Sequence, residues 1–409
     1  MTTAYKQWLG GATAVSQVTT ITVVAGNASD TITITFTGED GSTQTATAAS
    51  HGTTSTVAEN IRAALAGSSN SLFGFATYSA LSNVVTCTAS IPGRPFSLAA
   101  PDVGSTNLTV ATPTANAGPN DFQTAANFTP SGVPDNNDIV YFTSGSHDVL
   151  YGLQNSGVGL SELVVGEGFF GNVGRPGYPL VIDVDTGGKQ RVTLSGSGGV
   201  YNLKGSLTNV DITKNVGSIT LTGDMGGTNI TGGAVSGSIT IDGDSTTSND
   251  ITVSSVGPGC HIMVPSTATG TNNILMDSGL LELSAATKTN SQAIVSGTGV
   301  LRTLGTGVVS AGSTTHYPGS IAAYNGSTYE HKSSASLQGA VTLAVVGGRA
   351  DFSQTPNPGG AELVDIGVVK VYSGALDATA AGLMIDVTGV TKFGGVVNLS
   401  AATLAGTTK

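Results

Sequence analysis

Apolar and polar residues alternate over short stretches near the start of this chain, which is the pattern of strands with one buried face. Residues 18–24 alternate in this way, and in TITITFT at 31–37 the residues Ile32, Ile34 and Phe36 lie on one side with threonines on the other. The segment GNASD between the two stretches is rich in turn residues. The pattern therefore predicts a hairpin with one buried face.

One stretch has helical rather than strand spacing. Val57, Ile61 and Leu65 recur every four residues, Thr56 and Glu59 fit a T-x-x-E capping box, and Gly67 follows. This predicts a helix over Val57–Ala66. Further strands are predicted at about 71–78, 83–89, 96–99 and 106–112. Residues 18–115 are thus expected to form a small α+β module in which one helix covers a sheet.

The later part of the chain repeats itself. Val192, Tyr201, Val210 and Ile219 fall nine residues apart, and the octapeptide that starts at Gly217 returns almost unchanged at Gly237. A fixed period with Gly, Asn and Asp turns favours a right-handed parallel β-helix, or β-solenoid, with roughly 20–30 residues per coil. The alternative is a β-sandwich of antiparallel hairpins, since Gly-Asp and Gly-Gly turns also suit them.

These patterns divide the chain into five expected parts within a mainly β fold. They are an N-terminal arm (1–17), the α+β module with one helix (18–115), a linker and solenoid-opening segment (116–185), the β-solenoid (186–310), and a β-rich C-terminal cap or oligomerisation region (311–409). A cap is expected because the last coil of a solenoid has an open sheet edge.

The opening segment also carries a resemblance. Asn127 and Phe128 precede a G-x-P segment at 132–134 and the strand D-x-V-x-F at 138–142. This arrangement resembles the start of β-solenoids in phage surface proteins and autotransporter-like adhesins, with Phe128 where a tryptophan is usual. The resemblance implies that the aromatic residue caps the first coil and that the chain is a surface protein.

Composition narrows the function classes. Of 409 residues 39% are hydrophobic and only 10% are charged, and the formal net charge is −11. The 15 basic residues do not cluster, which argues against nucleic-acid and membrane partners. Cys87 and Cys260 are too few for a disulfide framework and are interpreted as buried thiols. Residues 1–17 have no apolar run of a secretory signal, so a virion assembled in the host cytoplasm is the expected location.

Motifs for chemistry are weak. The segment GEGFFG at 166–171 fits G-x-G-x-x-G, but two prolines follow it, so a turn that exposes Phe169 and Phe170 is expected rather than a dinucleotide site. Short acidic groups that could bind calcium are Asp135 with Asn137 and Asp138, Asp183 with Asp185, and Asp242 with Asp244. The histidines lack metal-site spacing, and Glu162, Glu167 and Glu282 are too scattered to nominate a catalytic pair. No catalytic, cofactor or metal residue is therefore predicted.

Aromatic and apolar residues outside the repeats are the candidate contacts. Tyr5, Trp8 and Leu9 would anchor the arm, either on a neighbouring subunit or on the chain's own domain. Phe169 and Phe170 would contact a neighbouring coil or subunit. Tyr317, Tyr324 and Tyr329 would be exposed and could stack on sugars.

The sequence therefore favours a non-enzymatic structural protein of a phage virion. The leading hypothesis is a capsid decoration or cement protein that binds the major capsid protein or other virion proteins. The alternative is a trimeric tail fibre or spike that binds host surface glycans. A homo-oligomer, most simply a trimer, fits either hypothesis.

Overall fold

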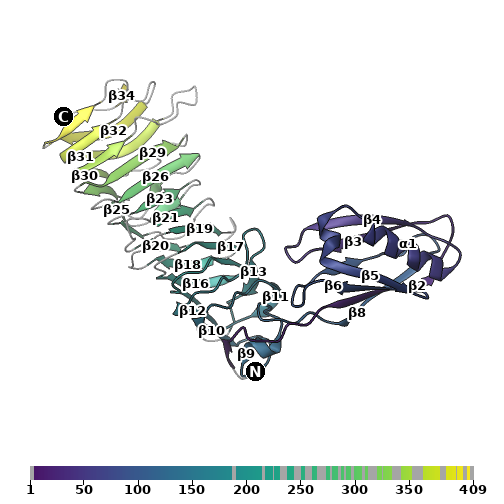
Figure 1. Ribbon diagram of the computed structural model, residues 1–409. Coiled ribbons are helices and arrows are strands. Elements are labelled where there is room, and N and C mark those ends of the chain that lie inside the picture. The colour runs from purple at the N-terminus through teal and green to yellow at the C-terminus, as the bar shows by residue number, and fades with distance from the viewer. Residues whose placement is uncertain are drawn as a thin grey trace.

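The computed structural model describes residues 4–186 without a gap and a series of shorter segments beyond them. These are 190–213, 217–223, 225–230, 237–243, 250–253, 260–264, 273–276, 279–283, 287–289, 292–295, 299–305, 309–311, 320–324, 326–333, 342–351, 363–377, 384–392, 394–398 and 403–405. Figure 1 shows two bodies: a long stack of short strands, here called the rod, and a compact module that projects sideways from one end of it. The expectation of a mainly β fold is confirmed.

The module spans residues 18–114 and contains two small antiparallel sheets with one helix. One sheet has the order β5-β6-β2-β8 and the other β4-β3-β7. The strands are β2 (Val18–Ala25), β3 (Thr31–Thr37), β4 (Thr43–Ala49), β5 (Ala76–Leu81), β6 (Val84–Ala89), β7 (Ser97–Ala99) and β8 (Asn107–Thr114), and the 3-10 helix η1 (Ser71–Phe75) precedes β5. Helix α1 (Thr54–Ala66) contacts strands of both sheets and buries Val57, Ile61 and Leu65 in the core between them.

Two predictions for the module are wrong in detail. Strands β2 and β3 do not form a hairpin, because β2 pairs with β6 and β8 while β3 pairs with β4 and β7. The capping box is also wrong, since α1 begins at Thr54, its N-cap Thr53 makes no side-chain cap, and Glu59 pairs with Arg62 instead. Alternation alone gives the buried face of each strand but not its partner. The end of the helix at Gly67 is confirmed.

Between β10 and β23, the strands of the rod pair in parallel with the next strand but one. One ladder runs β10-β12-β14-β16-β18-β20-β22-β25-β28-β30, and a second runs β11-β13-β15-β17-β19-β21-β23-β26-β29-β30. Strand β31 pairs with β30, β32 and β33, β32 also pairs with β34, and β24 pairs with β27. Alternate strands therefore build separate ladders along one rod.

The bounds of the rod strands follow the chain in order. They are β10 (Ile139–Gly145), β11 (Gln154–Gly159), β12 (Glu162–Phe169), β13 (Leu180–Asp183), β14 (Arg191–Leu194), β15 (Tyr201–Lys204), β16 (Leu207–Ile212), β17 (Ile219–Gly223), β18 (Met225–Ile230), β19 (Gly237–Gly243), β20 (Asp250–Val253), β21 (Cys260–Val264), β22 (Asn273–Met276), β23 (Leu280–Leu283), β24 (Thr287–Thr289), β25 (Gln292–Val295), β26 (Val300–Gly305), β27 (Val309–Ala311), β28 (Ser320–Tyr324), β29 (Thr328–Ser333), β30 (Thr342–Asp351), β31 (Leu363–Asp377), β32 (Met384–Lys392), β33 (Val396–Asn398) and β34 (Thr403–Ala405).

The sequence repeat has a direct structural cause. Val192 pairs with Val210, and Tyr201 pairs with Ile219, so residues nine positions apart belong alternately to the two ladders. The repeated octapeptide also lies in register, because Ile219 pairs with Ile239. The pairings between these strands are parallel, so the alternative of antiparallel hairpins is wrong for the described strands. Each repeat lays its apolar residues on those of the one before, which makes a continuous core.

The first strand of the chain belongs to the rod rather than to the module. Strand β1 (Tyr5–Trp8) pairs in parallel with β10 and antiparallel with β9 (Phe128–Thr129), which follows the 3-10 helix η2 (Ala125–Asn127). The module is therefore inserted between the first strand of the rod and the rest. Of the two uses considered for residues 1–17, the described residues show the second: they pack on their own chain.

Parallel pairing extends on both sides of residues 186–310. It is present from β10 and β12, in the segment expected to open the solenoid, and it continues through β28–β34, in the region expected to be a cap or oligomerisation region. From β10 on, the described pairings between rod strands are all parallel.

Candidate functional site

The junction between module and rod, here called the elbow, brings together a buried amide with carboxylate, guanidinium and aromatic side chains. Two chain segments cross it, one entering the module before β2 and one leaving it after β8 (Figure 1). The fully buried side chain of Asn127 is hydrogen-bonded to both segments. Its Oδ1 accepts a hydrogen bond from the Ala12 amide at 2.9 Å, and its Nδ2 donates to the carbonyls of Gly118 at 2.7 Å and Asp121 at 2.8 Å. The two crossing segments are thus held by buried hydrogen bonds.

A carboxylate with two guanidinium partners ties the module to the rod. Glu39, in the turn between β3 and β4, accepts from Arg94 Nε and Nη2 at 2.6 Å each and pairs with Arg175 of the rod at 3.2 Å. The Glu39 side chain is only 11% exposed. Burial raises the pKa of Glu39, but the hydrogen bonds from Arg94 and the charge of Arg175 outweigh burial, so this pKa lies below its ordinary value. The carboxylate is therefore held in its charged form.

Aromatic rings extend this ion pair in both directions. The Arg94 guanidinium carbon lies 4.5 Å from the ring centre of Phe75 in the module, and that of Arg175 lies 4.8 Å from the ring centre of Tyr151 in the rod. Close to these groups the ring of Tyr178 lies against Gly41, where an added Cβ would come within 2.9 Å of the ring. The contacts form one connected network, here called the Glu39 latch.

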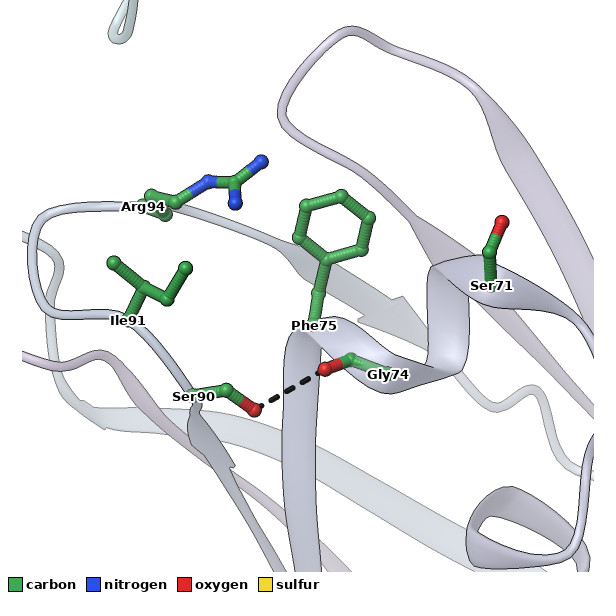
Figure 2. A pocket seen from close by; sticks show the side chains of 6 residues that line it. All are labelled: Ser71, Gly74, Phe75, Ser90, Ile91 and Arg94. Carbon is green, nitrogen blue, oxygen red and sulfur yellow. Dashed lines mark hydrogen bonds between the residues drawn. The ribbon is translucent and has the colours of Figure 1, made fainter.

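A pocket of about 370 Å³ opens beside the latch (Figure 2). Figure 2 shows Ile91 and Arg94 on one side facing Phe75, with Ser90 below them and with Gly74 and Ser71 beyond Phe75. The Ser90 hydroxyl donates to the Gly74 carbonyl at 3.2 Å. The lining thus combines Phe75 and Ile91 with two serines and with the Arg94 guanidinium, which is bound to Glu39.

Further exposed apolar residues lie at the elbow. Leu9, Val15 and Ile91 are 47%, 39% and 49% exposed. Val15 lies next to the turn that carries Ile91, since the Gly93 amide donates to the Val15 carbonyl at 3.1 Å and the Val15 amide to Ala117 at 2.8 Å. Adjoining exposed apolar side chains of this kind mark interaction sites more often than isolated ones do. Leu9, Val15, Ile91 and the pocket are called the elbow surface below.

A second cavity, of about 270 Å³, separates the module from the rod. Glu39, Pro95 and Phe96 line its module side, and Gln123, Leu153 and Tyr178 line its rod side. The two bodies therefore meet through the latch and the crossing segments and leave a gap beside them. Because few contacts set the angle between the two bodies, this angle depends on each of those contacts.

The predicted contact residues near the N-terminus separate into two kinds. Trp8 is buried at the base of the rod, where its ring contacts Phe122, Phe128 and Phe142 and its Nε1 donates to the His147 carbonyl at 3.1 Å. Tyr5 and Leu9 are exposed, and the Tyr5 ring stacks on Tyr141 with centroids 6.1 Å apart. Trp8 thus serves its own chain, while Tyr5 and Leu9 stay accessible to a partner.

The other predicted contact residues are placed differently from expectation. Phe169 ends strand β12 and is fully buried, so the expected exposed turn is wrong for it, although its ring does contact Phe142 and Tyr201 on other strands of the rod. Phe170 is exposed. Tyr329 is fully buried in the core of the rod, so its predicted exposure is also wrong. Tyr317 and the side chain of Tyr324 lie outside the described residues. The alternation of buried and exposed positions, rather than aromatic character, decides these outcomes.

The candidate acidic sites act locally where they are described. Asp138 accepts from the Ala4 amide at 3.1 Å and the Asp135 amide at 3.0 Å, which fastens β1 to the rod. Glu282 pairs with Arg302 at 2.8 Å and with His261 at 2.5 Å. Asp244 lies outside the described residues. Within the described part of the chain, no three His, Cys, Asp or Glu side chains lie close enough to hold a metal ion.

Among the helices of the described residues, none is both long and apolar enough to cross a membrane.

Sequence reasoning missed the residues that make the elbow. Glu39, Arg94 and Arg175 are separated by 55 to 136 positions along the chain, and no local pattern links them. One signal was available, namely the scarcity of charged residues in the module. Strands β2–β8 contain no charged residue, so each charged residue in a loop of the module was a candidate for an ion pair with a specific partner.

Comparison with known proteins adds no relative. A scan against protein-family models, a search of curated proteins and a search of solved structures found no match.

Proposed function

We propose that this chain is a structural, non-enzymatic protein of a phage virion, most simply a capsid decoration or cement protein. Its elbow surface would dock on the major capsid protein or another virion protein. Its rod, as a right-handed parallel β-helix, would project from the particle or lie across it. The observation that carries the proposal is the parallel stacking of strands from β10 to β34, with an apolar core and a module attached at one end only.

Several features support a role in shape rather than in chemistry. Strand stacking makes a stiff, extended body because each repeat is fixed by the repeats on either side. The handedness is proposed because parallel strands joined by crossovers in one sheet are right-handed in nearly all proteins. A homo-oligomer, such as a trimer, would bring several rods together on one particle.

The elbow surface supports docking at the base of the rod. Its exposed apolar side chains and its pocket lie where the module meets the rod, so a partner bound there would contact both bodies. Interfaces of this type gain free energy from a central apolar patch surrounded by polar residues. Docking through the elbow surface would leave the rest of the rod without contact to the partner.

The proposal is tested with purified particles and surface variants. Val15→Asp together with Ile91→Asp should reduce the amount of protein on particles at least tenfold, because buried unpaired carboxylates are costly at an interface. Leu81→Asp is the matched control, since Leu81 is 82% exposed in β5. Unchanged occupancy of the double variant would contradict docking through the elbow. Deleting residues 1–17 is not suitable, because it would also remove Trp8 from the core.

The alternative is a trimeric tail fibre or spike that binds host surface glycans. The exposed Tyr5 ring, stacked on Tyr141, is the described feature that favours it. Copy number separates the two hypotheses: hundreds of copies per particle support a decoration protein, and a handful supports a fibre.

A further inference from the structure

We propose that strand β4 of the module pairs with β4 of a second copy of this chain, antiparallel and about a two-fold axis. The inference goes beyond the proposed function, because it gives the homo-oligomer a defined interface that does not depend on a virion. Three observations carry it. β4 is an open edge strand without charge, its exposed threonine row matches itself, and its two ends carry complementary groups.

The edges of the two module sheets differ in how well they are protected. Natural edge strands are usually blocked, because their free amides and carbonyls would pair with another chain. β8 is blocked by Pro113, by two register shifts and by the Asp102 carboxylate, which accepts from the Leu108 amide at 2.6 Å. β7 has only three residues. β4 and β5 pair with their neighbours without a bulge and contain neither proline nor charge, so these two edges are open (Figure 1).

The bonds at the two ends of the β3–β4 hairpin show which groups of β4 face outward. The Gly38 amide donates to the Ser42 carbonyl at 2.8 Å, and the Ser50 amide donates to the Asp30 carbonyl at 3.0 Å. Because antiparallel pairs exchange bonds at every second position, the even-numbered residues of β4 bond to β3. Within the described residues, no strand pairs with the other side of β4. Three odd-numbered residues direct their amides and carbonyls to that side: Thr43, Thr45 and Thr47.

The side chains of these three residues form an exposed row that matches itself. Thr45 already lies opposite Thr35 of β3. A two-fold axis at Thr45 places it opposite its own copy and places Thr43 opposite Thr47 of the second copy, so all three outward-facing residues pair. Threonine pairs of this kind stabilise antiparallel sheets. Since β4 has no charged residue, two chains of net charge −11 bring no like charges together within these strands.

The two ends of β4 carry groups of complementary charge. Asp40, in the turn before the strand, is exposed, and its carboxylate accepts from Ser42 of the same turn. After the strand, residues 50–53 lead into α1, whose N-cap Thr53 makes no side-chain cap and whose first turn has no acidic residue. The antiparallel register brings Asp40 of each copy beside this helix start of the other. A carboxylate there is favourable, because it faces free amides and the positive end of the helix dipole.

Analytical ultracentrifugation of the full-length chain tests the pairing with two matched double variants. Thr43→Lys with Thr47→Lys puts lysine opposite lysine across the axis and should raise the dimer dissociation constant at least about tenfold. Thr43→Lys with Thr47→Glu puts lysine opposite glutamate and should keep the constant within about threefold of the native value. A native chain that stays monomeric up to about 500 μM, or equal constants for the two variants, would overturn the proposal.

A lysine in the other open edge assigns the contact to β4 rather than to β5. Ser79→Lys, at an exposed position of β5, should leave the dissociation constant unchanged. A rise as large as that caused by Thr43→Lys with Thr47→Lys would overturn the assignment. The elbow variant, Val15→Asp with Ile91→Asp, should dimerise like the native chain, so the docking proposal and this contact fail separately.

Cross-linking tests the position of the axis. With Cys260 replaced by alanine, Thr45→Cys should form a disulfide between two copies under mild oxidation, because directly opposed residues have Cα atoms about 5.5 Å apart. Thr43→Cys should not, since it lies opposite Thr47 and far from its own copy. Cross-linking of Thr43→Cys in place of Thr45→Cys would overturn the register.

Discussion

Trp8 is buried in an aromatic cluster at the base of the rod. In the sequence, the inserted module separates Trp8 from the other rings of this cluster. The Trp8 ring lies against Phe128, with centroids 5.2 Å apart at 70°, and against Phe122 and Phe142. The aromatic at Phe128 was expected to cap the first coil, and the structure places it beside the single tryptophan of the chain. This aromatic cluster is thus shared between residues from two distant segments.

This packing leads to a prediction for single residues. Trp8→Ala should lower the free energy of unfolding by roughly 3–5 kcal/mol, because it leaves a large cavity among buried rings. Tyr5→Ala, three residues earlier and exposed, should change it by less than about 0.5 kcal/mol. Urea titration followed by far-ultraviolet circular dichroism provides the measurement. Equal effects of the two substitutions would show that Trp8 does not close the core.

At the scale of elements, each strand of the rod is fixed by its neighbours rather than by its own sequence. The glycines at the ends of strands show this clearly. Gly223 ends β17 with φ +111°, and an added Cβ would lie 2.6 Å from the carbonyl oxygen of Gly205 in the repeat below. The close approach of one turn to the next requires the absence of a side chain.

A glycine substitution tests this stacking. Gly223→Ala should destabilise the rod by roughly 1–3 kcal/mol through backbone strain and the overlap with Gly205. Gly198→Ala is the matched control: its φ is not positive, and its Cβ would meet only the Phe170 side chain at 3.4 Å. The thermal midpoints of the two variants give the comparison. A stable Gly223→Ala variant would contradict the close approach of these turns.

Charged side chains follow the same register in the later repeats. Glu282, Arg302 and Glu330 occupy paired positions on successive strands, with Arg302 bonded to both carboxylates at 2.8 and 2.6 Å. Burial raises the pKa of Glu282, but the bonds from Arg302 and His261 outweigh it and hold this pKa below its ordinary value. Arg302 therefore lies between two carboxylates on neighbouring strands.

The sequence predicted elements better than it predicted their partners. The faces of β3 and the repeat through Val192, Val210 and Ile219 could be read directly, because alternation and period reflect burial. The separation of β2 from β3 into two sheets and the return of β1 to the rod could not, since they depend on contacts between distant segments. The elbow contacts could not be predicted for the same reason, since they also join distant segments.

For the whole molecule, the orientation of the module depends on the elbow contacts. The Glu39 latch joins the two bodies across a gap, and its carboxylate must be charged to pair with Arg94 and Arg175. Because the pKa of Glu39 is lowered in the folded protein, its contribution is present above the ordinary value of 4.5 and is lost as the pH falls through the lower folded value.

The lowered pKa of Glu39 gives a prediction for the effect of pH on the module orientation. The angle between module and rod should stay constant from neutral pH down to about 4.5 and should become more variable below it. Solution X-ray scattering across this range measures the change. Glu39→Gln should show the wider distribution already at neutral pH, whereas Glu59→Gln, which alters an exposed pair within α1, should not. An angle that is the same in all three proteins would argue against the latch.

The parallel stacking of the rod is the central claim, and one distance tests it most directly. Val164, Thr193, Asp211, Asn229 and Thr252 occupy paired positions on five successive strands of one ladder. Spin labels at Val164→Cys and Thr252→Cys, with Cys260 replaced by alanine, should therefore lie about 19 Å apart, four strand spacings of about 4.8 Å. Buried Cys87 should stay unlabelled, since burial raises its pKa to about 12. Pulsed electron paramagnetic resonance should give one narrow peak near that distance, and a broad distribution or a peak beyond about 35 Å would contradict the stack.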